Sequence, residues 1–430
     1  MDYSVGVDAG DTFTDAVLFD LAEERVVEVT KVRTTHEDLS KGILEAVDEV
    51  IGAIDPDDVV QVSLSSTLAT NSIVEDRGGP VGLLALGWKP EADKEFPRSI
   101  RGYVRGKFNP RGKETEPLDR KRAVELVEKW KGEVVGFAVS GYFGVRNPDH
   151  ENEVRQIVEE KTDKPVVTGH ELSPKLGFYE RAVTAVLNVK VIPIINSFID
   201  GAKSALEERG VHAPLMVVKS DGTLAKSDEV KKKPIETIFS GPAASAIGAR
   251  WLSGRSDGVV IDIGGTTVDI AVLRNGLPAL AESGVSVGRW NTKVQSMDLR
   301  SVGLGGDSQI QQNEEGNLVF GPATARPLAF GELPGEDLDK IELHEDASFV
   351  EKREGGNKDL NRLTESEERF YELIDGGAIN RTRLLDLARE EGLFRGIYYL
   401  RKLVRLGLLR RVALTPTDLL HVIGEYTAGN

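Results

Sequence analysis

Apolar residues flank a short polar turn in the stretch Val259–Leu273. Two runs rich in β-branched residues are joined there by Gly264-Gly265-Thr266-Thr267. Two such runs around a glycine turn predict a strand, a tight turn and a second strand. Asp262 precedes the turn and Asp269 follows it. A turn that only reverses the direction of the chain does not need two carboxylates and two threonine hydroxyls.

The same pattern occurs near the start of the chain, in residues 5–18. At an offset of 254 residues, Asp8, Gly10, Thr12 and Asp15 align with Asp262, Gly264, Thr266 and Asp269. By average residue usage, such a four-residue match arises by chance at roughly 10⁻⁵ to 10⁻⁴ per position. We therefore predict an internal repeat of one supersecondary unit, with two unrelated hairpins as the alternative.

The rest of the pattern predicts strands and helices in alternation, which is typical of an α/β fold. The expected strands are 26–34, 59–64, 81–86, 134–140 and 215–218, and the expected helices are 39–51, 120–131, 149–161 and 177–208, the last broken at Pro193. The charged, Gly- and Pro-rich residues 87–117 are expected to form an exposed loop. The acidic residues 333–361 are expected to be a mobile connection.

The last seventy residues change character. Helices are expected at 365–374, 381–391 and about 396–406, followed by a strand-like run, which is the outline of a winged helix-turn-helix. The third helix and the run after it are basic, with Arg395, Arg401, Lys402, Arg405, Arg410 and Arg411. However, 54 Lys and Arg stand against 70 Asp and Glu, a net charge of −16. We therefore expect a packing or partner-binding module, and the charge argues against nucleic acid.

Composition narrows the class of protein further. A chain of 430 residues with 40% hydrophobic and 29% charged residues fits a globular protein of two or three domains. The absence of cysteine excludes disulfides, thiolate zinc sites and cysteine nucleophiles. The N-terminal residues lack signal-peptide features, and no uninterrupted apolar run approaches the ~20 residues of a membrane span. We expect a cytoplasmic protein without a membrane partner.

Both glycine turns have the chemistry of phosphate-binding loops. Glycines let backbone N–H groups approach a phosphate, threonine hydroxyls add donors, and a carboxylate can hold a hydrated divalent cation. In a second glycine cluster, Gly305 and Gly306 are candidates for contact with a nucleotide, with a plain loop as the alternative. The helix start at Ser240-Gly241-Pro242 is typical either of an anion-binding site, formed by free backbone N–H groups, or of a tightly packed helix entry. Neither a P-loop nor a dinucleotide-binding motif occurs in the sequence.

Two phosphate loops far apart in one chain resemble the actin, sugar-kinase and 70-kDa heat-shock ATPase superfamily. Further segments narrow the resemblance to the hydantoinase/5-oxoprolinase A-type family, which is N-methylhydantoinase A-like. The segments are 6–15, 66–71, 179–188, 240–244, 262–269 and 414–422. They follow the order of the family along nearly the whole chain, so the resemblance is specific.

The resemblance implies two actin-like (ribonuclease H-like) domains flanking a nucleotide cleft. The expected domains are residues 1–175, residues 176–360 with hinge helices, and a small winged-helix-like module in residues 361–430. The implied chemistry is the use of ATP to phosphorylate a lactam, cyclic ureide or ketone carbonyl, followed by hydrolysis or carboxylation. Some family members work with a B-type partner subunit. A homo-oligomer is left open.

The resemblance also assigns site residues. Asp8 and Asp262 are expected to hold Mg²⁺ or to act as the catalytic base. The residues expected to contact ATP are Gly10, Asp11, Thr12, Gly264, Gly265, Thr266, Thr267, Gly305 and Gly306. The candidates on the substrate side are Thr67, Thr70, Asn71 and Arg181. Asp418 and His421 lie three residues apart on an expected helix, where they would either share a metal or form a surface hydrogen-bonded pair.

Two features depart from the family. Asp11 stands where family members usually have glycine, and an extra carboxylate would repel phosphate by about a few kcal/mol at short range unless a cation intervenes. The chain also ends soon after residues 414–422, where family members usually continue, as expected of a fragment or a shortened form. These departures favour the alternative of a nucleotide-binding regulatory or scaffold subunit without turnover. A sugar or carboxylate kinase would share the loops but not residues 240–244 and 415–421.

Overall fold

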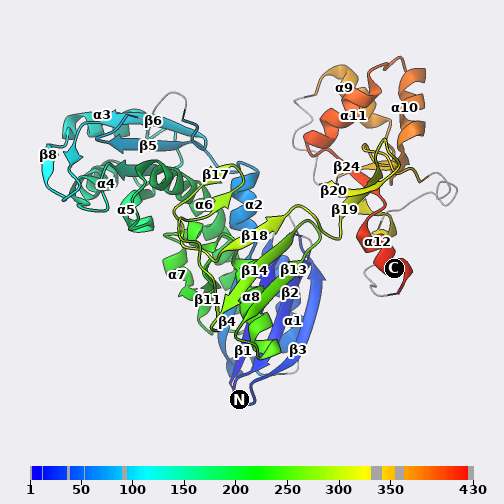
Figure 1. Cartoon of the computed structure of the whole chain (residues 1–430), viewed down its shortest axis with the longest axis horizontal. Helices are drawn as coiled ribbons and strands as arrows, with labels where there is room; N and C mark the ends of the chain where they lie inside the picture. The colour runs from blue at the N-terminus through cyan, green and yellow to red at the C-terminus, as the bar shows by residue number, and fades with distance from the viewer. Residues whose placement is uncertain are drawn as a thin grey trace. The chain divides into compact units, whose positions relative to one another are not determined.

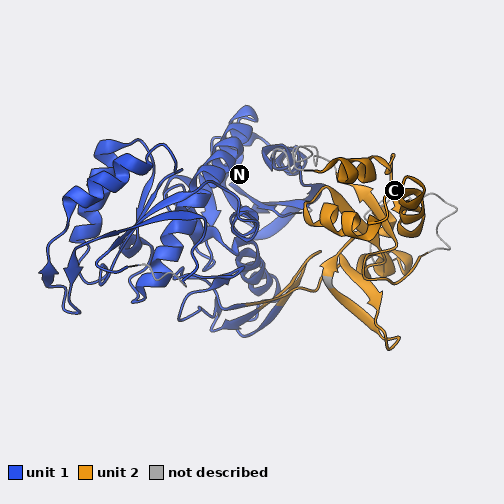
Figure 2. Cartoon of the chain, turned by 90° about the horizontal axis from the view of Figure 1, so that it is seen from above, with its two compact units in different colours: residues 1–260, 271–299 blue, residues 261–270, 300–430 orange. Residues whose placement is uncertain are grey.

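The computed structural model describes residues 2–11, 13–35, 39–52, 54–89, 94–330, 341–353 and 363–424 (Figure 1). The chain forms two compact units, coloured separately in Figure 2. Unit 1 comprises residues 1–260 and 271–299, and unit 2 comprises residues 261–270 and 300–430. The expected domain boundaries after residues 175 and 360 remain a prediction.

Unit 1 begins with a six-stranded sheet in the order β12-β11-β4-β1-β2-β3. Its strands are β1 (Tyr3–Ala9), β2 (Phe13–Asp20), β3 (Arg25–Arg33), β4 (Val59–Ser66), β11 (Leu215–Val218) and β12 (Leu224–Lys226). The first three strands are antiparallel neighbours, whereas β4 runs parallel to β1 and β11 runs parallel to β4. Helix α1 (Leu39–Ile51) packs against β1, β2 and β3 with its apolar side.

A second, parallel sheet in unit 1 has the order β10-β9-β5-β6. Its strands are β5 (Val81–Leu86), β6 (Ser99–Val104), β9 (Phe137–Gly141) and β10 (Val166–Thr168). Leu84 and Leu86 belong to a core with helices α3 (Arg120–Trp130) and α4 (Asp149–Lys161), while Leu83 and Ala85 face the core around α6 (Phe178–Glu208). The two central strands, β5 and β9, are buried along their whole length, as strands of a parallel sheet covered on both faces usually are.

The exposed loop expected in residues 87–117 is wrong. Strand β6 lies within it, followed by the short hairpin of β7 (Lys107–Phe108) and β8 (Glu114–Glu116). Val104 is buried, and β6 pairs along its whole length with β5. The partner strand therefore supplies the hydrogen bonds and apolar cover that this charged, glycine-rich stretch does not indicate by its own pattern.

Helix α6 belongs to the same core as both sheets of unit 1. It is one continuous helix of 31 residues with Pro193 inside, so the expected break at this proline is wrong. Proline has no backbone N–H, so one hydrogen bond of the helix is lost at Pro193. Pro193 itself is exposed, but the helical turns on either side of it are buried, and their packing keeps the helix continuous. By length and composition α6 would cross a membrane, but 72% of its apolar window is buried inside the protein.

The remaining elements up to residue 302 belong to unit 1, apart from residues 261–270 and 300–302, which belong to unit 2. They are η1 (Pro56–Asp58), α2 (Leu68–Val74), α5 (Gly169–Leu172), α7 (Ser227–Val230), η2 (Pro234–Thr237), α8 (Ser240–Ser253), β13 (Gly258–Ile263), β14 (Val268–Arg274), β15 (Leu277–Pro278), β16 (Ser286–Val287), β17 (Trp290–Asn291) and β18 (Leu299–Val302). The predicted hairpin is confirmed as β13 and β14, and the boundary between the units passes through it. Ala243 and Ala246 of α8 share a small core with Ala271 and Leu273 of β14.

As far as the structure describes it, unit 2 combines a hairpin, a four-stranded sheet and four short α-helices. Its elements are β19 (Ser308–Gln312), β20 (Leu318–Thr324), β21 (Arg326–Pro327), η3 (Leu328–Phe330), β22 (Phe349–Lys352), α9 (Glu365–Glu372), β23 (Ile379–Asn380), α10 (Arg381–Glu390), α11 (Gly396–Arg405), β24 (Leu409–Ala413) and α12 (Pro416–Val422). The three helices predicted near the C-terminus are confirmed to within two residues. Phe370, Leu384 and Leu400 form their common core.

The connection expected in residues 333–361 is partly wrong. Strand β22 lies within it and pairs with β23 and β24, and its Phe349 and Val350 are fully buried. Residues 333–340 and 354–361 lie outside the described residues. The basic residues nearby are engaged in ion pairs: Arg401 with Asp346, Lys402 with Glu367 and Arg410 with Glu351. These cations hold the parts of unit 2 to one another.

Replacement of a side chain in α6 tests its place in the core. Leu187 is buried there, so Leu187→Ala should lower the free energy of unfolding by about 2–5 kcal/mol through lost apolar burial and a cavity. Leu176→Ala removes the same atoms from an exposed position and should cost less than about 0.5 kcal/mol. Urea denaturation measures both. Equal losses would contradict a core role for α6.

Candidate functional site

Both hairpin turns are closed by the same backbone hydrogen bond. Gly10 N–H donates to the carbonyl oxygen of Phe13 at 3.0 Å, and Gly264 N–H donates to that of Thr267 at 2.9 Å. Phe13 and Thr267 are themselves 254 residues apart, so the offset read from the sequence holds in the structure. A Cβ on Gly10 would lie 2.8 Å from the Phe13 oxygen, which explains the glycine. Thr12, expected to contact phosphate, lies outside the described residues.

Asp8 stands at the end of β1 where three elements of unit 1 meet. Ser65 at the end of β4 donates a hydrogen bond to Asp8 Oδ1 at 2.6 Å. A Cβ on Gly241, in the first turn of α8, would lie 3.5 Å from the same oxygen. The sequence analysis identified the helix start at Ser240 but not Ser65. The carboxylate, a hydroxyl and a helix N-terminus therefore lie together beside the first glycine turn.

Serine and threonine side chains hold this helix start in place. Ser240 Oγ donates to the Ser66 carbonyl at 3.0 Å and accepts from the Ser66 N–H at 3.1 Å. Phe239, which precedes α8, has a φ of 59°, and its N–H donates to Thr70 Oγ1 at 3.1 Å. Thr70 therefore orders the backbone before α8, a role that the substrate assignment did not include.

Thr67 and Asn71 lie beside the first glycine turn as well. The Thr67 N–H donates to the carbonyl of Ala9 at 3.3 Å, and Asn71 Nδ2 donates to Thr67 Oγ1 at 3.3 Å. Both residues belong to the start of α2, a helix that the sequence analysis did not predict. The structure thus brings three of the four candidate substrate residues to the neighbourhood of Asp8.

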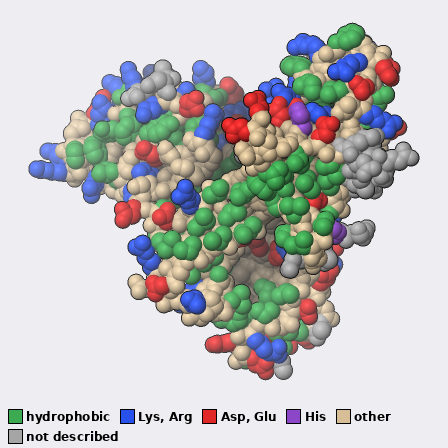
Figure 3. All heavy atoms as spheres, turned by 45° about the vertical axis from the view of Figure 1, so that its right-hand side comes forward, with side chains coloured by type: hydrophobic (Ala, Val, Ile, Leu, Met, Phe, Trp, Pro, Cys, Tyr) green, Lys and Arg blue, Asp and Glu red, His purple; other side chains and the backbone are tan. Residues whose placement is uncertain are grey.

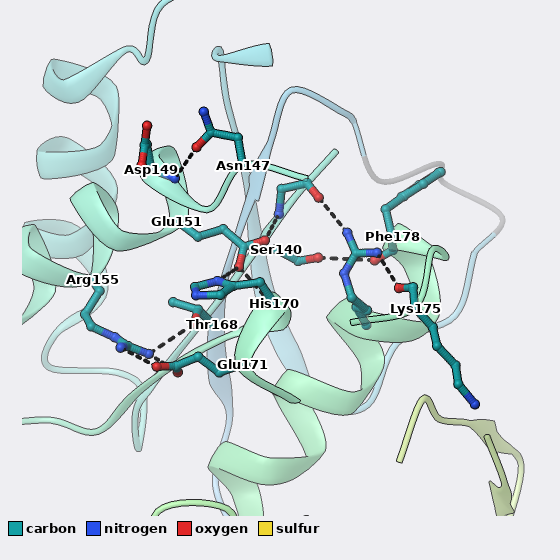
Figure 4. A network of polar contacts seen from close by, with 12 residues as sticks. Ser140, Asn147, Asp149, Glu151, Arg155, Thr168, His170, Glu171, Lys175 and Phe178 are labelled. Carbon is teal, nitrogen blue, oxygen red and sulfur yellow. Dashed lines mark hydrogen bonds and ion pairs between the residues drawn. The ribbon is translucent and has the colours of Figure 1, made fainter. Parts of the chain in front are cut away.

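Arg181, the fourth candidate, belongs to a different set of polar contacts, beside the end of strand β9. Figure 4 shows this network around Ser140, Glu151 and His170. Arg181 Nη2 donates to the Gly141 carbonyl at 2.8 Å and its Nη1 to the Lys175 carbonyl at 3.1 Å. Glu151 accepts from the Gly141 N–H at 2.6 Å and from His170 Nδ1 at 2.6 Å. Burial lowers the pKa of the Arg181 guanidinium, opposed by the charges of Glu151 and Glu180.

The structure does not bring Arg181 together with the residues of α2. Among the described residues, its side-chain hydrogen bonds go only to backbone carbonyls of the second sheet and the turn before α6. The Gly141 carbonyl also accepts from the Gly144 N–H at 3.1 Å, so the buried guanidinium is a second donor to that oxygen. Its role in this structure is to join strand β9 to the start of α6.

The second glycine turn, in unit 2, is supported by the other glycine cluster. Gly306 N–H donates to the Gly264 carbonyl at 3.0 Å, and Asp307 N–H donates to the Gly265 carbonyl at 2.7 Å. A Cβ on Gly305 would overlap the Gly265 oxygen. The two glycine pairs therefore lie together, and Gly305 and Gly306 support the second glycine turn through backbone contacts. Their contact with a nucleotide stays a prediction.

The segment Thr415–Asp418 supports the same region. Thr417 N–H donates to the Gly306 carbonyl at 2.9 Å. Asp418 Oδ1 accepts from Ala329 N–H and Oδ2 from Thr415 N–H, both at 2.8 Å, so Asp418 caps α12 and ties it to η3. Asp418 is buried, so the expected surface pair does not describe it, and the metal shared with His421 stays a prediction. The caps use both of its oxygens.

Asp262 and Asp269 place two carboxylates on the second hairpin. Burial raises the pKa of Asp269, hydrogen bonds from Ser301 and Thr267 oppose this, and the charge of Asp262 raises it further. A divalent cation would relieve the repulsion, and Mg²⁺ in phosphate sites needs only one or two carboxylates. The residues therefore fit the expected cation. Asp269 was absent from the sequence-based assignment, although it belongs to the repeat.

Comparison with known protein families identifies the chain. The hydantoinase/oxoprolinase N-terminal region matches residues 4–162, and the hydantoinase/oxoprolinase family matches residues 181–331. Together they cover well over half of the chain. The chain belongs to the hydantoinase/oxoprolinase family.

Related proteins share this region at low identity. Caprolactamase subunit alpha of Pseudomonas jessenii is 27% identical over 76% of this chain and 52% of its own length. Acetophenone carboxylase gamma subunit of Aromatoleum aromaticum is 27% identical over 77% of this chain and 50% of its own length. The chain thus spans about half the length of these relatives.

Two solved structures share the mixed α/β fold. The nucleotide-free structure of acetone carboxylase has a TM-score of 0.64 at 20% identity, and the ATP-dependent caprolactamase of Pseudomonas jessenii has a TM-score of 0.65 at 23% identity. Each comparison covers 94% of this chain and 61% of the other. At these identities the likeness shows the fold alone.

The contact between the glycine pairs can be tested with a matched pair of variants. Gly305→Ala forces the Gly265 carbonyl to move and should cost about 1–3 kcal/mol of unfolding free energy. Gly303→Ala, two residues earlier, has open space around its Cβ and should be close to neutral. Chemical denaturation compares them. Equal stability of the two variants would contradict the role of Gly305 as a support.

The raised pKa of Asp269 predicts a pH dependence of stability. The folded state keeps the proton to higher pH than the unfolded state, so unfolding free energy falls as pH rises above the ordinary pKa of an aspartate. Asp269→Asn should make this fall shallower. Urea denaturation at several pH values between about 4 and 7 measures it. An unchanged or steeper fall in the variant would contradict the assignment.

Proposed function

We propose that the chain carries the nucleotide-binding part of an ATP-dependent enzyme that phosphorylates a lactam, cyclic ureide or ketone carbonyl for hydrolysis or carboxylation. The observation that carries the proposal is the repeated turn, in which an aspartate ends a strand and a glycine N–H closes the loop. The relatives are named for caprolactam, acetophenone and acetone, and two of the solved structures are described as ATP-dependent.

The proposed architecture is two actin-like domains around a nucleotide cleft, with a winged-helix-like module near the C-terminus. The strand order β3-β2-β1-β4-β11 in unit 1 and the copied hairpin β13–β14 support the first part. Helices α9, α10 and α11 followed by β24 support the second. The proposed location is the cytoplasm.

Phosphoryl transfer needs positioning and charge neutralisation more than covalent help from the protein. Asp8 and Asp262 would hold Mg²⁺, which neutralises phosphate charge when it is bound. Gly10, Gly264 and Gly265 let the chain approach phosphate closely, and the exposed Thr266 would donate its hydroxyl. The Thr267 hydroxyl donates to Asp269 at 3.3 Å, so its role would be to orient that carboxylate. Asp8 would also serve as the base on the attacking oxygen.

A partner subunit is part of the proposal. Three relatives are named as an alpha, a gamma and a beta subunit, and the chain spans about half of their lengths. A B-type subunit would therefore complete the substrate side. A homo-oligomer is the other arrangement that we propose to test.

The second candidate function is a nucleotide-binding regulatory or scaffold subunit without turnover. Asp11 favours it, because this exposed carboxylate follows Gly10 in the first loop, where it would oppose phosphate. With Mg²⁺ bound, Asp11 would instead add to the charge that holds the cation.

The test is ATP turnover in the presence of caprolactam, 5-oxoproline, acetone or acetophenone. Asp8→Asn and Asp262→Asn should each lower kcat by about 10²–10⁴-fold, because each removes charge or a base from the transition state. Glu28→Gln, on the exposed side of β3, should leave turnover unchanged. Binding of MgATP without turnover by the wild-type protein, with a B-type partner subunit present, would overturn the enzymatic proposal in favour of the regulatory subunit.

A further inference from the structure

Acidic side chains lie at many places on the face drawn in Figure 3, where basic side chains are interspersed with them. An exposed carboxylate of this kind changes its rotamer within picoseconds to nanoseconds. Asp8 differs, because it is only partly exposed and two other elements of unit 1 lie against its carboxylate. The proposed function assigns the cation to Asp8, so the groups that fix this carboxylate also affect how it binds a cation.

The first sheet of unit 1 places Ser65 beside Asp8. Strands β1 and β4 are parallel neighbours, and Asp8 and Ser65 are paired residues in their register. Ser65 Oγ donates a hydrogen bond to Asp8 Oδ1 at 2.6 Å, a length typical of a hydroxyl that is bonded to an ionised carboxylate. The register of two core strands therefore brings the hydroxyl to the carboxylate.

Helix α8 reaches the same carboxylate. A Cβ on Gly241 would lie 3.5 Å from Asp8 Oδ1 and 3.7 Å from Oδ2, so the first turn of the helix lies close to both oxygens. Two hydrogen bonds between Ser240 Oγ and the backbone of Ser66 tie this turn to the residue after Ser65. The N-terminal end of a helix carries a partial positive charge, which favours a carboxylate beside it. The end of β4 and the start of α8 therefore form one support for Asp8.

The Ser65 hydroxyl is well enclosed, since the residue is only 3% exposed. Water therefore does not readily replace it as the donor to Asp8. A carboxylate has about four lone-pair positions, so one hydrogen bond from Ser65 does not prevent Asp8 from binding a cation. In known metal sites, removal of a group that fixes a metal ligand typically lowers metal affinity or activity about 10–100-fold.

We propose that Ser65 is a positioning residue, whose hydroxyl holds the Asp8 carboxylate in the orientation that binds Mg²⁺. Ser65 thereby determines how strongly Mg²⁺ tightens the binding of a nucleotide. This inference rests on the proposed function, which assigns the cation to Asp8. Ser65 lies on β4, outside the repeated turn, so the repeat did not identify it. A purely structural role, in which Asp8 only satisfies a buried hydroxyl, predicts instead that loss of the hydroxyl lowers stability without affecting the cation.

The test measures the binding of ADP to the whole chain by isothermal titration calorimetry, once with Mg²⁺ and once with EDTA. The ratio of the two dissociation constants is the gain in affinity from Mg²⁺. Ser65→Ala should lower this gain about tenfold, because the carboxylate is no longer fixed, and should leave the affinity for ADP in EDTA unchanged. Ser65→Cys keeps a side chain of similar size with only a weak donor, and it should lower the gain as well.

Ser63→Ala is the matched control. Ser63 lies two residues earlier on the same face of β4, where it is paired with Gly6 and accepts a hydrogen bond from Gln61 Nε2 at 3.0 Å. Loss of this hydroxyl leaves the contact with Asp8 intact, so the gain from Mg²⁺ should be unchanged. Asp8→Asn removes the proposed cation ligand and should lower the gain at least as much as Ser65→Ala.

Three results would overturn the inference. If Asp8→Asn lowers the gain while both Ser65 variants keep it, Ser65 is not a positioning residue, and the cation site of the proposed function stands. If Ser65→Ala and Ser63→Ala lower the gain equally, the loss is a general effect of removing a hydroxyl from β4. If Mg²⁺ gives the wild-type protein no gain, or if Asp8→Asn keeps the gain, the cation does not bind at Asp8, and the proposed cation site fails together with the inference.

Discussion

A single backbone hydrogen bond, from a glycine N–H to the carbonyl three residues later, determines both glycine turns of this protein. The bond forms only where the backbone can approach closely, and at Gly10 a side chain would meet the Phe13 carbonyl. Asp8 and Asp262 each lie next to one of these turns, at the second-last residue of the strand that precedes the turn. The same hydrogen bond therefore closes the backbone of both turns.

The two turns are supported in different ways. In unit 1, Thr34 Oγ1 donates to the Gly10 carbonyl at 3.0 Å, and Ser65 and the start of α8 approach Asp8. In unit 2, the carbonyls of Gly264 and Gly265 accept from a second glycine turn. The first turn therefore depends on hydroxyl side chains from other strands, whereas the second depends on close contact between backbones. Only the second requires a further pair of glycines.

Comparison of the two hairpins shows which features a local sequence pattern specifies and which depend on the surrounding structure. Val5 and Val259 stand at equivalent positions of equivalent strands, yet one lies in the core and the other on the surface. The alternation specifies a strand with one apolar face. Whether that face is covered depends on helices and strands elsewhere in the chain.

The sequence by itself determined the elements whose periodicity is strong, the repeat and the family. Helix α1, strand β5 and helix α4 lie where the pattern placed them, since helical spacing in α1 and α4 and a continuous apolar run in β5 specify them locally. The tertiary structure alone decided the rest. Strand β6 exists because β5 lies beside it, and Arg181 is bonded to carbonyls of distant segments. Asp418 caps a helix while holding η3, and Gly305 supports a turn forty residues before it. Each of these depends on contacts between residues far apart in the chain, which spacing along one segment does not contain.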